Sequence, residues 1–261
     1  MRFRNLNFPL FVCTAIISAI CCGLPHAAAA QTKEIVLVHG AWVDASGWKP
    51  VYKILEKDGY HVSMVQEPLI TLDGDVIATR RVIDMQPGEV VLVGHSYGGS
   101  IITEAGNDPK VAALVYICAH APDAGETQAE NGKRFPSVLS KASAIETTAD
   151  GFTFVNPAKF SNLFASDVPI DQAQFEANSQ VLAAAQLFKT PISNPAWKVK
   201  PSWALIATGD KVISPDLERF YAERAHSHTV TIQGSSHSAY YTHPQEVAAL
   251  IEAAAKGTSG P

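Results

Sequence analysis

Three residues of this 261-residue chain have the types that a nucleophile, a base and an orienting acid require. Ser96 lies in Gly-His-Ser-Tyr-Gly, directly after an apolar run, and Asp210 and His237 each follow a further apolar run. A serine hydroxyl is a poor nucleophile on its own and needs a base, which in turn needs an acid to orient it. The order of the three residues therefore predicts nucleophilic catalysis by Ser96, with His237 as base and Asp210 as orienting acid.

The surroundings of Ser96 match the G-x-S-x-G pattern between a strand and a helix. A strand that turns directly into a helix forces the residue at the bend into a strained conformation. Glycine at positions 94 and 98 removes the side chains that would collide there. The serine hydroxyl is then held at the end of the sheet, where the first N–H groups of the helix also point. A plain strand-to-helix turn is the alternative explanation of the motif.

A tetrahedral oxyanion needs two N–H donors. We expect one to be the N–H of Tyr97, the residue after the nucleophile. The second is expected in the loop after the strand Glu34–Val38, where Gly40 allows close approach of the backbone and Ala41 supplies the N–H. The alternative is that this loop is only a turn.

Other residues compete for the same roles. Asp123 also follows an apolar run and is the second choice for the acid, while Asp216 fits a charge at a helix N-terminus. His226 and His228 resemble a metal pair, but no third ligand is evident, so we expect a solvated loop. No metal ion or organic cofactor is needed for the predicted chemistry.

Apolar runs that alternate with amphipathic stretches must position these residues. Continuous apolar runs, rather than alternating ones, indicate a parallel sheet covered by helices on both faces. The strands are expected at 34–38, 61–65, 89–93, 111–119, 203–207 and 228–232, and the helices at 48–57, 76–85, 100–105, 215–225 and 244–255. Because parallel strands end at one edge of the sheet, the three catalytic candidates should meet there.

Residues 122–197 interrupt this rhythm and carry seven phenylalanines among polar and small residues. Such a length is too great for a plain connection, and so many phenylalanines do not fit a disordered linker. We expect a mostly helical cap over one end of the sheet, with a helical pattern over 181–188.

The first 30 residues predict a secretory signal peptide. Arg2 and Arg4 precede an apolar stretch, and Ala28-Ala29-Ala30 fits a cleavage site before Gln31. The protein should therefore be periplasmic or secreted, with residues 31–261 forming one domain and no stable membrane insertion. Cys118 is the one cysteine after the signal, and we expect a buried, inert thiol. The net charge of −5 gives no indication of a nucleic-acid surface.

Four segments carry a resemblance to the α/β-hydrolase superfamily, namely LVHGAWVDASGW (37–48), GHSYGG (94–99), ATGDKVIS (207–214) and GSSHSAYYTHP (234–244). Together they resemble the small capped esterases grouped with plant methylesterases and hydroxynitrile lyases. The resemblance implies a six-stranded core beginning at Glu34 and a cap after the strand at 111–119. It also implies Ser96, Asp210 and His237 as the triad, with Ala41 and Tyr97 as oxyanion donors.

Two departures favour the esterase branch. The lyases tend to have threonine where this chain has Gly40, and lysine where it has Ser238, so cyanohydrin cleavage is not expected. A haloalkane dehalogenase would need a carboxylate at position 96. The expected reaction is hydrolysis of small, uncharged, fairly hydrophobic carboxylic esters through an acyl-enzyme.

The substrate-binding residues are expected to include Trp42 and Tyr240, whose rings, with those of the cap, would form an apolar pocket. His95 is placed with them, although its side chain should point away from the serine. The alternative is that the cap aromatics form only the core of the cap. Perhydrolysis and lactone or amide hydrolysis remain open on the same triad, as does a non-catalytic ligand-binding protein with a hydrolase fold.

Overall fold

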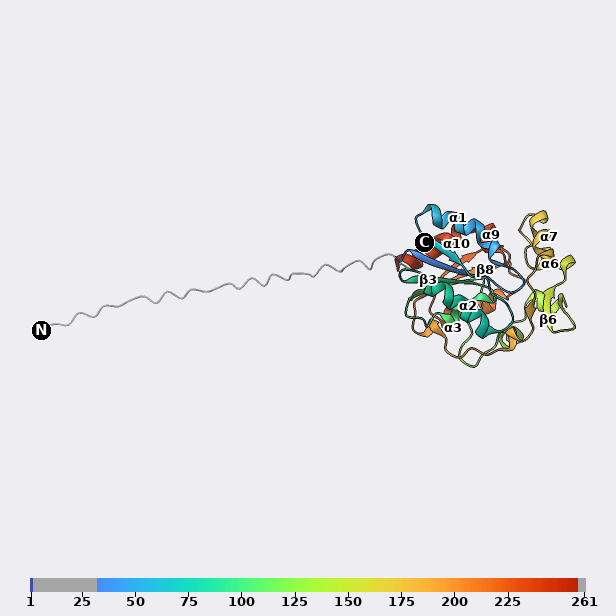
Figure 1. The fold of residues 1–261 in the computed structure, drawn as a ribbon, viewed down its shortest axis with the longest axis horizontal. Coiled ribbons are helices and arrows are strands. Elements are labelled where there is room, and N and C mark those ends of the chain that lie inside the picture. Colours follow the sequence, from blue (N-terminus) through green and yellow to red (C-terminus); the bar gives the residue numbers. More distant parts are fainter. Residues whose placement is uncertain (2–31, 258–261) are drawn as a thin grey trace.

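The computed structural model describes Met1 and residues 32–257, so the predicted signal peptide lies, apart from Met1, outside the described residues. A six-stranded sheet forms the centre of the molecule (Figure 1). Its strands are β1 (Glu34–Val38), β2 (His61–Met64), β3 (Val90–His95), β4 (Val111–Ile117), β8 (Ser202–Ala207) and β9 (His228–Ile232). All neighbours are parallel, in the order β2-β1-β3-β4-β8-β9, which confirms the predicted parallel sheet.

Helices cover both faces of this sheet. They are α1 (Lys49–Lys57), α2 (Leu72–Asp84), α3 (Gly98–Ala105), α8 (Pro215–Arg224), α9 (Ala239–Thr242) and α10 (Pro244–Lys256), with a 3-10 turn at Ala45–Trp48 before α1. Successive β1 side chains point to opposite faces: Val36 joins a core with α2, α3 and α8, and Leu37 a second core with α1 and α10. Burial on both faces explains why the strands read as continuous apolar runs.

The strand order places the predicted site. Strand β1 lies between β2 and β3, so the chain leaves β1 toward one side and returns on the other. Loops after β1 and β3 therefore diverge at the carboxyl edge of the sheet, and such a switch point leaves a crevice where ligands bind. The segments that carry Ala41 and Ser96 follow these two strands directly.

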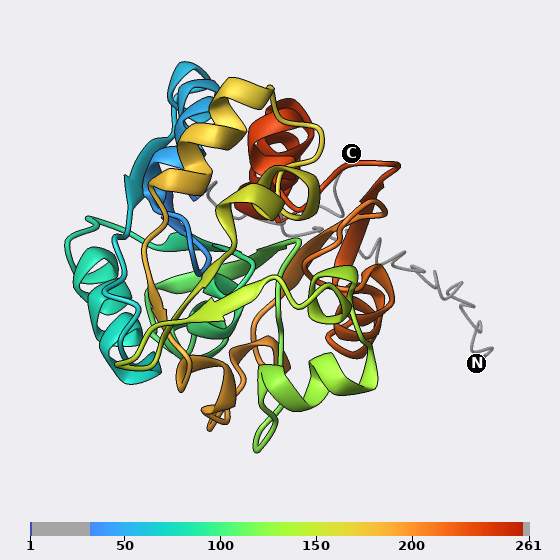
Figure 2. The same cartoon turned by 90° about the vertical axis from the view of Figure 1, so that its right-hand side faces the viewer.

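A cap lies between β4 and β8 in the chain, and Figure 2 shows it from its outer side. Its elements are α4 (Gln128–Arg134), α5 (Val138–Lys141), β5 (Ile145–Thr147), β6 (Phe152–Val155), α6 (Pro157–Leu163), α7 (Ile170–Asn178), β7 (Ala183–Ala184) and 3-10 turns at Leu187–Lys189 and Ala196–Lys198. Strands β5, β6 and β7 form an antiparallel sheet that was not predicted. The predicted helix over 181–188 is wrong, because Ala183 and Ala184 pair with β6 and only a 3-10 turn begins at Leu187.

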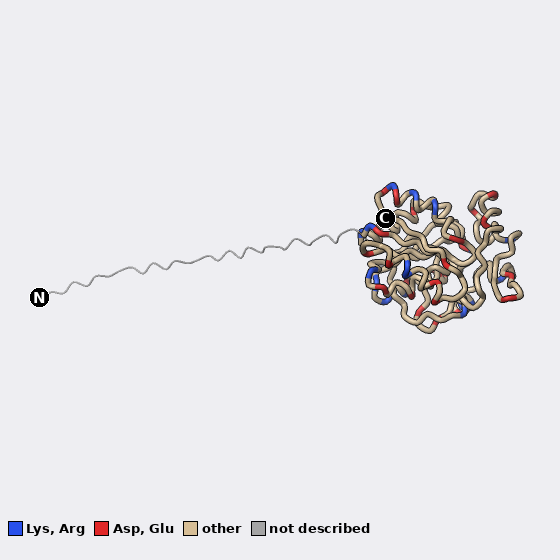
Figure 3. The backbone as a smooth tube through the Cα atoms, in the orientation of Figure 1, with Lys and Arg blue, Asp and Glu red and all other residues tan. Residues whose placement is uncertain are grey.

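Charged residues of both signs are interspersed along the described chain (Figure 3). Within the described residues, no helix combines the length and the apolar composition that crossing a bilayer requires. Cys118 is fully buried, and burial raises the pKa of its thiol well above the usual value. A thiol that resists ionisation in this way is a weak nucleophile, as the sequence predicted.

Candidate active site

Ser96 lies at the bend between β3 and α3. Its φ of 54° falls in the left-handed region that non-glycine residues rarely adopt. The bend is held by its own backbone, since the N–H of Ser96 donates to the carbonyl of Ile117 and its carbonyl accepts from the N–H of His120. A Cβ on Gly94 would lie 2.6 Å from the carbonyl oxygen of Gly98, so a side chain there would open the bend. The strand-to-helix turn predicted from the motif is therefore present.

Asp210 and His237 form a buried hydrogen-bonded pair at the same edge of the sheet. His237 Nδ1 lies 2.5 Å from Asp210 Oδ2, and both side chains are inaccessible to solvent. Asp210 Oδ1 also accepts the N–H groups of Val212 and Ile213, at 2.7 and 2.9 Å, which fix the carboxylate. The second choice for the acid, Asp123, instead contacts Lys198.

The other ring nitrogen of the histidine is free. His237 Nε2 is buried and makes no hydrogen bond within the described part of the chain, to Ser96 or to any other residue. The pair with Asp210 places the proton of the neutral ring on Nδ1, so Nε2 is a base without a partner. Hydrogen bonds between nucleophile and base are often loose before substrate binds, so this geometry is compatible with catalysis.

Two backbone segments meet Ser96 at one cavity. Ala41 and Tyr97, the predicted oxyanion donors, both line the cavity that Ser96 lines. Tyr97 is the N-cap of α3, at the helix end where N–H groups have no acceptor inside the helix. A Cβ on Gly40 would lie 2.7 Å from the Cβ of Ser96, so only glycine lets the loop after β1 come this close.

Buried polar contacts brace these two segments, and sequence reasoning missed them. The Tyr97 hydroxyl donates to Asp75 Oδ2 at 2.8 Å, and Asp75 Oδ1 accepts the N–H of Leu69 at 2.9 Å. Burial raises the pKa of Asp75, while the hydrogen bond from Tyr97 opposes this rise. His39 contacts the buried carboxylate of Glu67. Burial lowers the pKa of His39, but Glu67 outweighs it and the net shift is upward.

The cavity at Ser96 has a volume of about 580 Å³. Trp42 forms part of its wall: its ring lies 5.4 Å from that of Phe188, and its Nε1–H donates to Thr153 Oγ1 at 3.1 Å. Thr153 belongs to β6, so the cap sheet is tied to the loop after β1. The remaining described lining residues are His120, Gln128, Ala129, Gly132, Lys133, Phe135, Pro136, Ser137, Leu139, Ser140, Lys141, Ile145, Val212, Ile213, Ser214 and Leu217.

Two of the three predicted substrate-binding residues lie outside this cavity. Trp42 lines it, but the structure places His95 and Tyr240 in the packing behind it, with ring centroids 4.4 Å apart. His95 Nε2 lies 3.0 Å from the carbonyl oxygen of His237, to which it donates a hydrogen bond. Burial, with the nearby His237, lowers the pKa of His95 well below its usual value. A neutral ring in this position supports the backbone of His237 rather than a ligand.

Asp167 of the cap holds the loop that carries His237. Its carboxylate accepts the N–H of Ser236 at 2.9 Å and also contacts the Ser236 hydroxyl. The carbonyl of Phe164 accepts a hydrogen bond from the Ser238 hydroxyl at 3.3 Å. These contacts join residues some 70 positions apart in the chain. Their sequence neighbourhood therefore gives no signal of the role.

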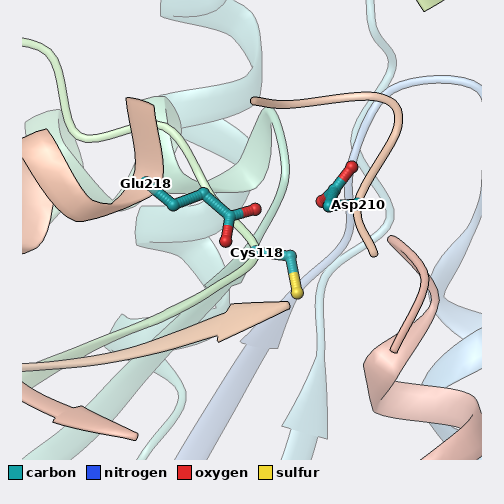
Figure 4. A group of neighbouring side chains, drawn as sticks. All are labelled: Cys118, Asp210 and Glu218. Atoms are coloured by element: carbon teal, nitrogen blue, oxygen red, sulfur yellow. The ribbon is translucent and has the colours of Figure 1, made fainter. Parts of the chain in front are cut away.

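One group of side chains in the described chain has the types that could hold a metal ion. The ligand atoms of Cys118, Asp210 and Glu218 lie within 4.8 Å of one another (Figure 4). Both Asp210 oxygens already accept hydrogen bonds, and Glu218 Oε2 accepts the N–H of Ala207 at 3.1 Å. A metal ion bound through Asp210 would have to compete with its contacts to His237, Val212 and Ile213.

Comparison with known proteins identifies relatives of this architecture. The model of the family described as "Alpha/beta hydrolase family" matches residues 35–250. A methylesterase from Arabidopsis thaliana, Methylesterase 8, is 21% identical over 88% of this chain and 92% of its own length. The crystal structure of polyneuridine aldehyde esterase superposes with a TM-score of 0.71 at 17% identity, over 85% of this chain and 98% of that one.

A second relative covers less of the chain. The carbendazim hydrolyzing esterase of Nocardioides sp. (strain SG-4G) is 32% identical over 44% of this chain. The match spans 51% of that enzyme's own length. The comparisons thus support the predicted resemblance to plant methylesterases and agree with the six-stranded fold.

Proposed function

The chain belongs to the alpha/beta hydrolase family, in which its relatives are ester hydrolases, and we propose that it is a serine esterase acting through Ser96. The observation that carries the proposal is the buried His237 ring. Its Nδ1 is held by Asp210, and its Nε2 has no partner within the described chain. A base in this state can accept a proton from Ser96, which lines the cavity at the bend.

In the proposed reaction, Ser96 Oγ attacks the ester carbonyl carbon as its proton passes to His237 Nε2. Asp210 keeps the ring in the required tautomer and stabilises the imidazolium that forms. The carbonyl re-forms as the alcohol leaves with the proton from His237, and the acyl group remains on Ser96. Water then repeats the sequence, and the acid and the free serine are released.

Negative charge develops on the carbonyl oxygen in both halves of the reaction. We assign its stabilisation to the N–H groups of Ala41 and Tyr97, which lie on the two segments that meet at Ser96. Donors held before the reaction begins need no reorganisation when the charge appears. The Asp75 and Glu67 contacts, which lie behind these segments, provide that rigidity.

The cavity favours uncharged, fairly hydrophobic esters. Its described lining contains no acidic residue, and the two lysines in it, Lys133 and Lys141, are exposed. The wall near Ser96 is formed by Trp42, Phe188 and Leu217, among others. An apolar acyl or alcohol group would lose its contact with water there, whereas a charged group would find few partners.

The proposal is tested with the purified protein and p-nitrophenyl esters of increasing acyl length. Ser96→Ala should reduce kcat by about 10⁴-fold or more, because the nucleophile is lost. Ser140→Ala, which removes another serine of the cavity wall, should leave kcat within about twofold. Equal rates for wild type and Ser96→Ala would reject the nucleophile, and inactivity of the wild type on all esters would favour a binding protein.

The apolar wall has its own test. Trp42→Ala should change the preference for acyl length, because the indole ring forms part of the cavity wall beside Ser96. The loss of kcat/KM should differ between short and long esters by about tenfold or more. An unchanged chain-length profile would count against an acyl site at this wall.

We also propose that the protein is exported and cleaved before Gln31. The support is the sequence pattern of residues 1–30. Intact-mass measurement of protein from the periplasm and medium should give the mass of residues 31–261. The full-length mass in the cytosolic fraction would contradict export.

A further inference from the structure

Glu218 is a buried carboxyl group directly behind the proposed triad. It lies on α8, and its side chain points toward Asp210 and Cys118 (Figure 4). The residue is 4% exposed. Its Oε2 accepts the N–H of Ala207, whereas its Oε1 is buried and receives no hydrogen bond from the described residues. An ionised carboxylate would leave that oxygen charged and without a donor.

The two neighbouring carboxyl groups are stabilised unequally. Asp210 accepts three hydrogen bonds, from Val212, Ile213 and His237, and these favour its ionised form. Glu218 accepts a single one. When two buried carboxyls meet, a shared proton relieves the repulsion between them, and it resides on the less stabilised group. That group is Glu218.

The charge of Arg219 favours ionisation of Glu218, but more weakly than burial and the charge of Asp210 oppose it. Within the described chain Glu218 forms no ion pair, and Arg219 on the same helix pairs with Asp216. The thiol of Cys118 faces it, and Tyr116 and Tyr221 line the same small space. Burial raises the pKa of all three, which keeps them neutral. Burial, and then the charge of Asp210, likewise raise the pKa of Glu218 well above its usual value.

We propose that Glu218 is a positioning residue that stays protonated and donates a hydrogen bond from its carboxyl group to the Asp210 carboxylate. The inference rests on the proposed function, because it assumes that Asp210 orients His237. The two carboxyl groups face each other, and an oxygen of Asp210 lies within 4.8 Å of an oxygen of Glu218 (Figure 4). The proton gives the buried Oε1 a partner and spreads the charge of Asp210. Asp210 is then held on three sides, by the loop after it, by His237 and by α8.

Two substitutions separate a neutral donor from a charged or merely space-filling group. In Glu218→Gln the amide can donate to Asp210 and accept from Ala207. The value of kcat/KM should therefore stay within about threefold, and the acid limb of its pH profile should not move. Glu218→Met keeps the volume without a donor. Its kcat should fall about tenfold with KM within about twofold, and the acid limb should move to higher pH, because Asp210 then stabilises the imidazolium more strongly.

The protonation state is read independently of turnover. Infrared difference spectra between wild type and Glu218→Gln at neutral pH should show the C=O stretch of a protonated carboxyl in the wild type. The same difference, recorded in the Ser96→Ala background, should keep this band while activity is lost. Activity that survives Ser96→Ala beside an intact band would reject the proposed function alone.

Three results would overturn the inference. One is a spectrum with only carboxylate bands from Glu218. The second is an acid limb that moves to lower pH by about one unit in Glu218→Gln, as expected if an ionised Glu218 raises the basicity of the site. The third is wild-type kcat for a folded Glu218→Met. If that variant does not fold, the infrared band and the glutamine variant still decide the matter.

Discussion

Removing the hydroxyl of Tyr97 should damage stability and catalysis together. In Tyr97→Phe the Asp75 carboxylate loses a 2.8 Å hydrogen bond in a site where both residues are almost inaccessible to water. A hydrogen bond to a charged group contributes about 1.5–3 kcal/mol to the free energy of unfolding. At about 2–4 °C per kcal/mol for a domain of this size, Tm should fall by about 3–12 °C.

The effect on catalysis follows from the position of Tyr97. Its N–H is a proposed oxyanion donor, and complete loss of one such donor costs about 10²–10³ in kcat. The substitution displaces the donor without removing it, so kcat should fall by about tenfold with KM within about twofold. Tyr116→Phe is the matched control, because its buried hydroxyl contacts the neutral Thr103 hydroxyl at 3.1 Å. It should lose about 1 kcal/mol of stability and keep its kcat.

A double-mutant cycle measures the contact itself. Asp75→Asn should destabilise the wild type, because a charged acceptor is replaced by a neutral one. In the Tyr97→Phe background it should be neutral or stabilising, because it removes a buried charge that has lost a donor. Urea unfolding should give a coupling of about 1.5 kcal/mol between the two positions. Losses that simply add, with a coupling under about 0.5 kcal/mol, would show that the Tyr97 hydroxyl does not stabilise the Asp75 carboxylate.

Three further predictions concern other parts of the site. Burial, and to a lesser extent the nearby His237, lower the pKa of His120 to about 3, whereas the unfolded chain binds this proton near pH 6.5. Its part of the free energy of unfolding should therefore be lost as pH falls from 6 to 4, by about 1.4 kcal/mol per pH unit. In urea unfolding at several pH values, His120→Asn should remove this dependence of the free energy of unfolding on pH, and His226→Asn, at an exposed position, should not. An equal dependence on pH in both variants would show that His120 is not its cause. Thr153→Val removes the acceptor of the Trp42 Nε1–H and should raise KM about threefold for long esters at unchanged kcat, while a fall in kcat alone would argue against a substrate wall. Gly94→Ala places a Cβ 2.6 Å from a backbone carbonyl, so the variant should lose about 3 kcal/mol of stability or be found insoluble, and wild-type Tm and kcat would show that the bend tolerates a side chain.

The sheet and the order of the proposed triad were predictable because each depends on local sequence. Continuous apolar runs mark strands buried on both faces, and parallel strands bring their following loops to one edge. Helix α2 shows that the boundaries of an element are harder to predict than its presence. It begins at Leu72, four residues before the predicted start, because the Thr71 side chain caps it at the N–H of Gly74. A single capping threonine is a weak signal in a polar stretch.

The cap was predicted in outline and missed in detail. Strands β5, β6 and β7 span only two to four residues each, which is too short for an alternating pattern to be distinguished. Their pairing depends on contacts within the cap, such as Phe152 with Ala184. The spacing of apolar residues over 181–188 is typical of a helix, because local spacing does not show that a partner strand is available.

Polar residues behind the site were missed because tertiary packing alone gives them their roles. In the sequence, Glu218 looks like an ordinary charged residue on a helix surface, and only the packing of α8 against β8 buries it. Asp75 and Glu67 become partners of the oxyanion segments only once the chain has folded. His95 and Tyr240 show the opposite error, because nearness in sequence to Ser96 and His237 did not bring their side chains into the cavity.

In the proposed reaction, Ser96 carries the acyl group between the two halves of the cycle. Stopped-flow mixing of wild-type protein with a p-nitrophenyl ester, in excess over enzyme, should show a burst of about one equivalent of p-nitrophenol before the steady state. Acid quenching during the burst should place the acyl mass on the peptide that contains Ser96, and Ser96→Ala should show neither signal. Turnover without an acylated peptide, or an acyl mass on a peptide that lacks Ser96, would show that Ser96 is not the nucleophile.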